Sequence, residues 1–109
     1  MSQPSQQKTR RQRLEEFVAA KPNDVFSRYG LAVECMNSGD APAAEEHFRK
    51  LIETSSDYVP AYQQLGQLLV RLGRSEEARG VLSSGMAAAQ KKGDAHARSE
   101  MEALLAELR

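Results

Sequence analysis

The feature that most constrains this chain is an internal repeat, because the sequence matches itself when it is shifted by 34 positions. At this shift of the 109-residue sequence, apolar residues meet apolar residues, small residues meet small residues and glycine meets glycine. The matched pairs are Leu31 with Leu65, Ala32 with Gly66, Cys35 with Leu69, Gly39 with Gly73, Ala44 with Ala78, and Phe48 with Leu82. A fixed period of this size is typical of arrays in which one supersecondary unit stacks on the next.

Each unit has the pattern of two consecutive α-helices. Apolar residues recur three or four positions apart, and no long segment alternates with the period of two that a half-buried strand requires. A glycine separates the two helical runs, where the turn between helices needs a positive φ. Pro42 and Pro60 fall in the first turn of a predicted helix, where the missing N–H is not needed. The predicted N-caps are Asn23 or Asp24, Asp40, Ser75 and Asp94.

We therefore expect an all-α fold of about six helices arranged as an α-solenoid of antiparallel helix pairs. Residues 1–5 are expected to be disordered and residues 6–22 to form an N-terminal helix equivalent to half a repeat. Two full repeats span 25–58 and 59–92, and a capping helix spans 94–109. One hairpin cannot bury its own apolar stripe, so stacking is required for a core. A plain six-helix bundle is the alternative.

On these residues the chain resembles the tetratricopeptide repeat family, whose units favour Leu, small and apolar residues in the first helix and Gly, Ala and an aromatic later. The chain departs from that pattern in two respects. Arg28 occupies a position that favours an aromatic, which Tyr62 supplies in the second unit, and neither Ser56 nor Gln90 is the expected closing proline. The resemblance covers residues 14–92 and implies a non-catalytic module that binds a protein partner.

In the resembled family, the first helix of each unit lines a concave groove for an extended peptide or a partner helix. The residues at those positions are Phe26, Tyr29, Val33, Met36, Asn37, Pro60, Gln63, Gln67, Val70 and Arg71, with Ala97, Met101 and Leu105 from the last helix. Apolar side chains beside amide and guanidinium donors suit an apolar segment with one carboxylate. The alternatives are that the N-terminal or C-terminal helix covers the apolar strip, or that a second copy covers it in a homodimer.

A chaperone-tail ligand is not expected. The family's clamp for chaperone C-termini requires Lys and Asn at two positions of its first repeat, which Tyr29 and Val33 occupy here, and Gln63 and Gln67 do not supply it either.

Candidate catalytic and metal-ligating residues are few. His47 follows two glutamates and His96 lies two residues after Asp94, but neither group contains enough ligands for a metal site. Cys35, the single cysteine, excludes an internal disulfide and is expected to be a buried packing residue. We therefore expect no enzymatic activity, no cofactor and no metal.

The charges cancel over the whole chain but not along it. Lys8, Arg10, Arg11 and Arg13 give the first thirteen residues a charge of +4, and the remainder carries −4. We interpret the basic segment as solvated or docked on the acidic body; polyanion or nucleic-acid binding is the weaker alternative, because no aromatics interleave with the bases. The mean hydropathy of −0.59 and the lack of a long apolar run exclude a membrane span, and a cytoplasmic location is expected.

Overall fold

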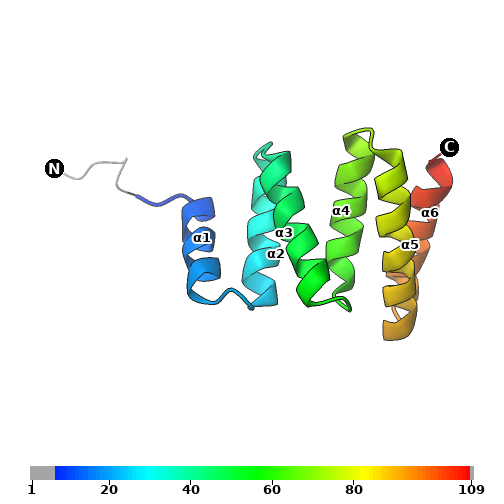
Figure 1. Cartoon of the computed structure of the whole chain (residues 1–109), viewed down its shortest axis with the longest axis horizontal. Coiled ribbons are helices and arrows are strands. Elements are labelled where there is room, and N and C mark those ends of the chain that lie inside the picture. The colour runs from blue at the N-terminus through cyan, green and yellow to red at the C-terminus, as the bar shows by residue number, and fades with distance from the viewer. Residues whose placement is uncertain (1–6, 109) are drawn as a thin grey trace.

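The computed structural model describes residues 7–108, and within this range the regular secondary structure consists of helices alone. The helices are α1 (Arg10–Ala20), α2 (Val25–Asn37), α3 (Ala41–Thr54), α4 (Val59–Arg71), α5 (Ser75–Lys92) and α6 (Ala95–Glu107) (Figure 1). The predicted all-α fold is therefore confirmed. The expected disorder of residues 1–5 lies outside the described residues.

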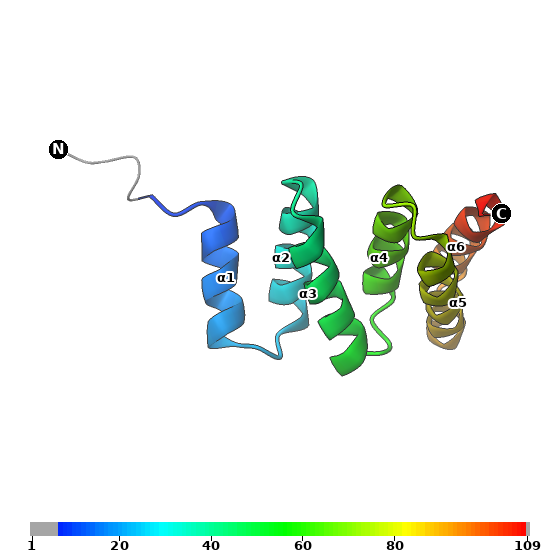
Figure 2. The same ribbon diagram turned by 45° about the horizontal axis from the view of Figure 1, so that its top comes forward.

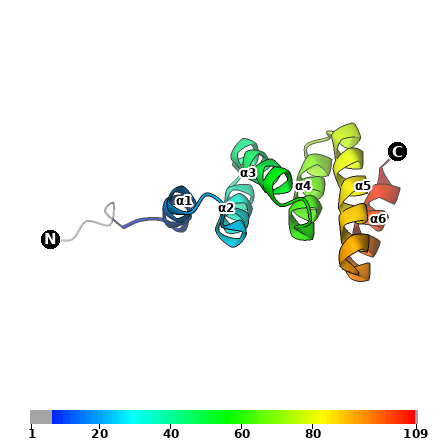
Figure 3. The ribbon, with the colours of Figure 1, turned by 60° about the horizontal axis from the view of Figure 1, so that its bottom comes forward.

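The helices form an elongated array rather than a bundle around one centre. They follow one another in chain order along the long axis (Figures 1 and 2), and the extents are 56 × 27 × 20 Å. The radius of gyration is 15.4 Å, whereas a compact domain of this length would have about 13 Å. Each helix packs on its neighbours in sequence, and α4 additionally contacts α2 and α6. Figure 3 shows α2 and α3 of the first hairpin one above the other.

Glycines in the left-handed region end α2, α4 and α5. Gly39, Gly73 and Gly93 have φ angles of 85°, 75° and 73°. After α2, the amide of Asp40 donates to the carbonyl of Cys35 at 2.8 Å, which closes a Schellman turn, and equivalent bonds follow α4 and α5. These turns reverse the chain over very few residues, so the two helices of a hairpin are antiparallel and adjacent.

The predicted caps are correct at two positions and wrong at Ser75. The carboxylates of Asp40 and Asp94 accept hydrogen bonds from backbone amides in the first turns of α3 and α6, at 3.2 and 3.0 Å. Ser75 is the first residue of α5, and Arg74 is its N-cap. The reason is the Schellman turn, because Gly73 and Arg74 repeat the places of Gly39 and Asp40. Asp24 precedes α2, but its carboxylate accepts from the hydroxyl of Ser27 instead of a backbone amide.

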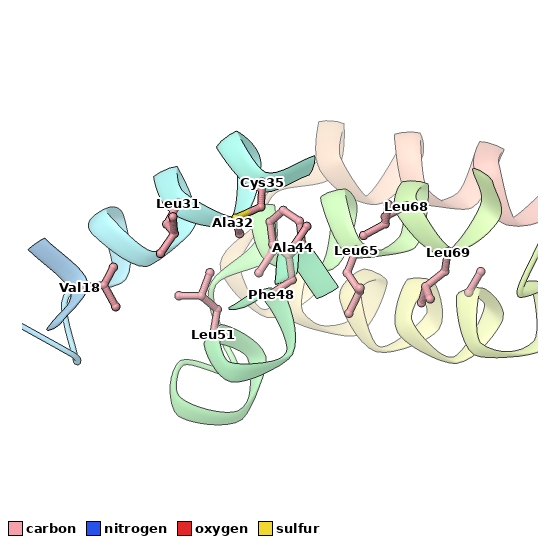
Figure 4. Close-up of a cluster of buried hydrophobic side chains, with 12 residues drawn as sticks. Val18, Leu31, Ala32, Cys35, Ala44, Phe48, Leu51, Leu65, Leu68 and Leu69 are labelled. Atoms are coloured by element: carbon pink, nitrogen blue, oxygen red, sulfur yellow. The ribbon is translucent and has the colours of Figure 1, made fainter. Parts of the chain in front are cut away.

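The residues matched by the 34-residue shift form the core. All five non-turn pairs are buried in both repeats: Leu31 and Leu65, Ala32 and Gly66, Cys35 and Leu69, Ala44 and Ala78, Phe48 and Leu82. Figure 4 shows part of this core, with Phe48 and Cys35 among the side chains drawn between the helices. At Gly66 an added Cβ would lie 2.9 Å from the Cγ of Leu82 and closer still to one of its methyl carbons, so the small residue permits the close approach of α4 and α5.

The register of α6 is displaced by two positions from the 34-residue period. The N-caps of α4 and α6 are Tyr58 and Asp94, which lie farther apart than one 34-residue period. The cause is the length of α5, which has 18 residues whereas α3 has 14. The shorter turn after α5 offsets only part of this difference. Met101 therefore occupies the place of Leu65 in the core and is 1% exposed. Its predicted position in the groove is wrong, and the same displacement buries Ala97.

Substituting Gly39 with Val should lower the free energy of unfolding by about 1–3 kcal/mol, because a β-branched residue is strained at positive φ. Gly80→Ala is the matched control. Gly80 lies inside α5, and no atom of a packed neighbour lies within 4 Å of the place an added Cβ would take, so its replacement should stabilise by about 0.5–1 kcal/mol. Chemical denaturation of both variants measures the difference, and a Gly39→Val protein as stable as wild type would contradict the assigned turn.

Candidate binding surface

The predicted groove residues of α2 and α4 form a surface with an apolar floor and a polar rim. Tyr29, Val33, Met36 and Val70 are partly buried and pack against the core. The exposed side chains are Phe26, Asn37, Gln67 and Arg71, while Pro60 and Gln63 are intermediate. We call these ten residues the inner face. Helices α2 and α4 contact one another directly, so the surface is continuous between the two repeats.

Side-chain hydrogen bonds join the successive first helices of the hairpins. Gln64 Nε2 donates to Tyr29 Oη at 3.3 Å across α2 and α4, and Gln63 Nε2 donates to Glu100 Oε1 at 3.0 Å across α4 and α6. The amide of Gln63 is thus engaged within the protein, while that of Gln67 faces solvent. The sequence does not predict Gln64 and Glu100 as site residues, because spacing alone does not show which residues meet across neighbouring repeats.

An aromatic cluster lies at the end of the inner face nearest the start of α2. The ring of Tyr58 lies 6.4 Å from Phe26 and 5.5 Å from Tyr29, both edge to face, and Tyr29 lies 6.1 Å from Phe48. Phe26 is nevertheless 77% exposed. Burial, with a smaller contribution from Tyr29, raises the pKa of the Tyr58 hydroxyl. The helical apolar pattern could not identify Tyr58, because it lies just before α4.

Arg71 supplies positive charge at the opposite end of the inner face. It forms no ion pair with the residues that the structure describes, although Arg74 three positions later pairs with Glu45 and Glu77. An exposed guanidinium without an internal partner can hold a carboxylate through two parallel hydrogen bonds. The inner face therefore combines exposed aromatic area, free amide groups and one available cation.

Outside the inner face, ion pairs join successive repeats at equivalent positions, but the acidic and basic residues exchange places from one pair to the next. Arg11 donates to Asp40 at 2.8 Å, and at the equivalent positions one repeat later Arg74 donates to Glu45 at 2.7 Å. The basic member comes first in one pair and second in the other. The guanidinium of Arg11 lowers the pKa of Asp40, and that of Arg74 lowers the pKa of Glu45. Hydrogen bonding from Arg74 also lowers the pKa of Glu77.

Most of the basic N-terminal segment is paired with the protein's own carboxylates. Lys8 lies 2.7 Å from Glu16, Arg10 lies 3.3 Å from Glu34, and Arg11 pairs with Asp40. These contacts match the expectation that the segment docks on the acidic body, and they reduce the charge available for a polyanion.

The isolated histidines and the cysteine do not assemble into a reactive group. His47 Nδ1 lies 3.1 Å from Arg28 Nη1, and burial together with this cation lowers the pKa of the imidazole. Cys35 is fully buried, and burial raises the pKa of its thiol. Among residues 7–108, no cluster of three or more His, Cys, Asp or Glu side chains has the arrangement of a metal site. In the same range no helix is both long and apolar enough to span a membrane.

A hollow of about 540 Å³ lies between α3 and α5, with one lining residue, Tyr62, from α4. Its lining residues are Arg49, Ile52, Glu53, Tyr62, Glu77, Gly80, Val81 and Ser84. The missing side chain at Gly80 leaves part of this space open, and the charged rim is already linked by the Arg49–Glu77 contact at 3.8 Å. The hollow contains none of the predicted groove residues.

Comparisons with known proteins give consistent matches along most of the chain. A tetratricopeptide repeat family model matches residues 36–108. The TPR repeat-containing protein PA0015 of Pseudomonas aeruginosa is 30% identical over 95 residues, which cover 87% of this chain and 90% of that protein. The solution structure of a tetratricopeptide repeat domain protein from Salinibacter ruber has a TM-score of 0.77 at 34% identity, covering 82% of this chain and 90% of that one. Protein BPP2914 of Bordetella parapertussis has a TM-score of 0.79 at 28% identity, covering 94% and 89%.

The ion pairs between repeats should make the fold sensitive to acid. Because the pKa values of Asp40, Glu45 and Glu77 are lowered on folding, their contribution is present above about pH 4–4.5 and is lost as the carboxylates protonate at lower pH. Thermal melts between about pH 7 and pH 3 should show a falling Tm. Glu45→Gln should lower the Tm at pH 7 and flatten this dependence, whereas the exposed Glu46→Gln should change neither. An identical pH profile for wild type and Glu45→Gln would contradict the assignment.

Proposed function

Because this chain belongs to the tetratricopeptide repeat family, whose domains are protein–protein interaction modules, we propose that it is a non-catalytic adaptor that binds a peptide or partner helix on its inner face. The single observation that carries this proposal is the 77% exposure of Phe26 beside the partly buried apolar floor. Within the described residues, α1 packs on α2 and α6 packs on α5 and α4, and neither helix covers Phe26 or Asn37, which stay exposed.

The chemistry of the inner face favours a bound segment with an apolar residue and an acidic group. An apolar side chain can pack on Phe26 and Tyr29, and exposed amides such as Gln67 can bond the partner's backbone. Arg71 can pair with a carboxylate. Tyr29 is already fixed by Gln64 and by its aromatic neighbours, so binding requires little ordering of these side chains, which favours affinity.

A second copy of the chain is the alternative occupant, supported by the same exposed Phe26. In that case the protein is a homodimeric assembly unit, and its inner face is closed by self-association. Alanine at Phe26 should then abolish dimerisation in sedimentation measurements. If the adaptor proposal is correct, the same substitution leaves the oligomeric state unchanged.

Peptide selection tests the adaptor proposal without knowledge of the natural partner. Peptides selected from a random displayed library on the immobilised wild-type protein should bind the inner face. Phe26→Ala and Arg71→Ala should each weaken these peptides by about tenfold or more, since exposed aromatics and arginines dominate such surfaces. Lys50→Ala, an exposed position on α3, is the matched control and should have no effect. Selected peptides insensitive to both inner-face changes would contradict the proposal.

A further inference from the structure

Helix α1 has an exposed aromatic residue at a position that is buried in the next repeat. Phe17 is 60% exposed, whereas Leu51, the equivalent residue of α3 one repeat later, is 1% exposed. The registers of the two helices are equivalent, because the amide of Lys21 donates to the Phe17 carbonyl just as the amide of Ser55 donates to that of Leu51, at 2.9 and 2.7 Å. Helix α1 is therefore the structural counterpart of the second helix of a hairpin.

The difference in exposure follows from the neighbours of the two helices. Helix α3 lies between α2 and α4, but in the described part of the chain α1 packs on α2 alone. The Phe17 face of α1 is equivalent to the Leu51 face of α3. On α3, this face packs against α2, the first helix of the same hairpin. On this face α1 lacks a helical partner among residues 7–108.

Helix α6 presents the complementary situation at the other end of the array (Figure 1). Ala97 and Met101 are buried like Ala61 and Leu65 of α4, so α6 is the counterpart of a first helix. It packs on α5 and α4, and its remaining surface is exposed, including Arg98 and Glu102. Within residues 7–108, α1 is thus a second helix of a hairpin without its first helix, and α6 is a first helix without its second.

The charges of these two exposed helices are complementary. On α1 the exposed bases Arg10 and Arg13 lie in the first half, and the exposed acids Glu15 and Glu16 precede Phe17. Arg10 lies 3.3 Å from Glu34, and Arg13 forms no ion pair with the described residues. The acidic residues exposed on α6 are Glu100, Glu102 and Glu107. An antiparallel pairing of α1 with α6 places Arg13 near Glu102 and Glu107 and places Glu15 and Glu16 near Arg98, so opposite charges meet at both ends of the contact.

If α1 of one copy packs on α6 of another in the antiparallel orientation found inside each hairpin, the positions of the charges along both helices are fixed. This orientation would place the basic first half of α1 beside the last turns of α6, where Glu102 and Glu107 lie. The carbonyl end of α6 carries the negative end of its helix dipole, which also favours Arg10 and Arg13.

We propose that α6 of one copy packs against the Phe17 face of α1 in a second copy, with Arg10 and Glu102 at the places that Ala44 and Gly66 hold in a hairpin, so that charged side chains join the two half repeats. The contact is heterologous and does not close, so copies add head to tail and lengthen the array. An interface of one helix pair falls below the roughly 1,200 Å² of a stable complex, so the association is weak and concentration-dependent. It leaves the inner face free and is therefore independent of the adaptor proposal.

Sedimentation velocity over about 10 µM to 1 mM, the range of weak association, tests this proposal on the full chain. At low salt the weight-average mass should rise from 12.1 kDa to beyond twice that value, and at about 0.5 M salt it should return toward the monomer because the charges are screened. Phe17→Glu should remain monomeric. Phe26→Ala, which alters an equally exposed aromatic elsewhere, should associate like wild type.

A mixing experiment distinguishes head-to-tail contact from a symmetric dimer. Phe17→Glu retains an intact α6, and the double variant Glu102→Lys, Glu107→Lys retains an intact α1. Each should be monomeric alone, and their mixture should form a heterodimer that grows no further. Circular dichroism checks that these exposed substitutions preserve the fold.

Three outcomes would overturn the proposal. These are a wild-type monomer at every concentration, self-association of the α6 double variant through α1 alone, and loss of association in Phe26→Ala, which would assign the contact to the inner face.

Discussion

The close approach of paired helices at small residues is the interaction on which the rest of this structure depends. Gly66 lies against Leu82, and Ala32 occupies the equivalent place in the first repeat, where Phe48 corresponds to Leu82. Each hairpin still has apolar surface that its own two helices cannot cover, so the next hairpin must stack on it. Stacking in one direction produces the elongated shape and places α2 and α4 side by side. The inner face is a consequence of this arrangement, because its floor consists of side chains that also pack against the core.

The sequence predicts the repeated part of the fold well because the same physical requirement appears twice, once in each repeat. Gly39 and Gly73 mark turns that need positive φ, and the small residues mark close helix contacts. Prediction is less successful where the period changes. The apolar spacing of α6 is compatible with two registers, and only the greater length of α5 determines that Met101 faces the core. Ser75 is a good capping residue by type, but the turn at Gly73 ends one residue too early for it to serve as one.

The candidate site was predictable in its helical positions and not in its contacts. Phe26 and Arg71 are where the helical pattern places them, whereas Tyr58 precedes its helix and Glu100 belongs to a neighbouring repeat. The ion pairs between repeats are likewise not predictable from the sequence pattern. Arg11 with Asp40 and Glu45 with Arg74 preserve attraction at equivalent positions while exchanging the signs, so a search for repeated charge along the sequence misses them. Contacts between repeats depend on pairs of residues, and single-residue patterns do not encode them.

A double-mutant cycle between Gly66 and Leu82 tests the close helix packing most directly. In wild type, Gly66→Ala should lower the free energy of unfolding, because the new methyl carbon would lie 2.9 Å from the Cγ of the buried Leu82 side chain. In the Leu82→Ala background the space is free, and the same substitution should stabilise the protein by about 0.5–1 kcal/mol through helix propensity. Equal effects of Gly66→Ala in both backgrounds would contradict the packing of α4 on α5 and, with it, the stacked repeats.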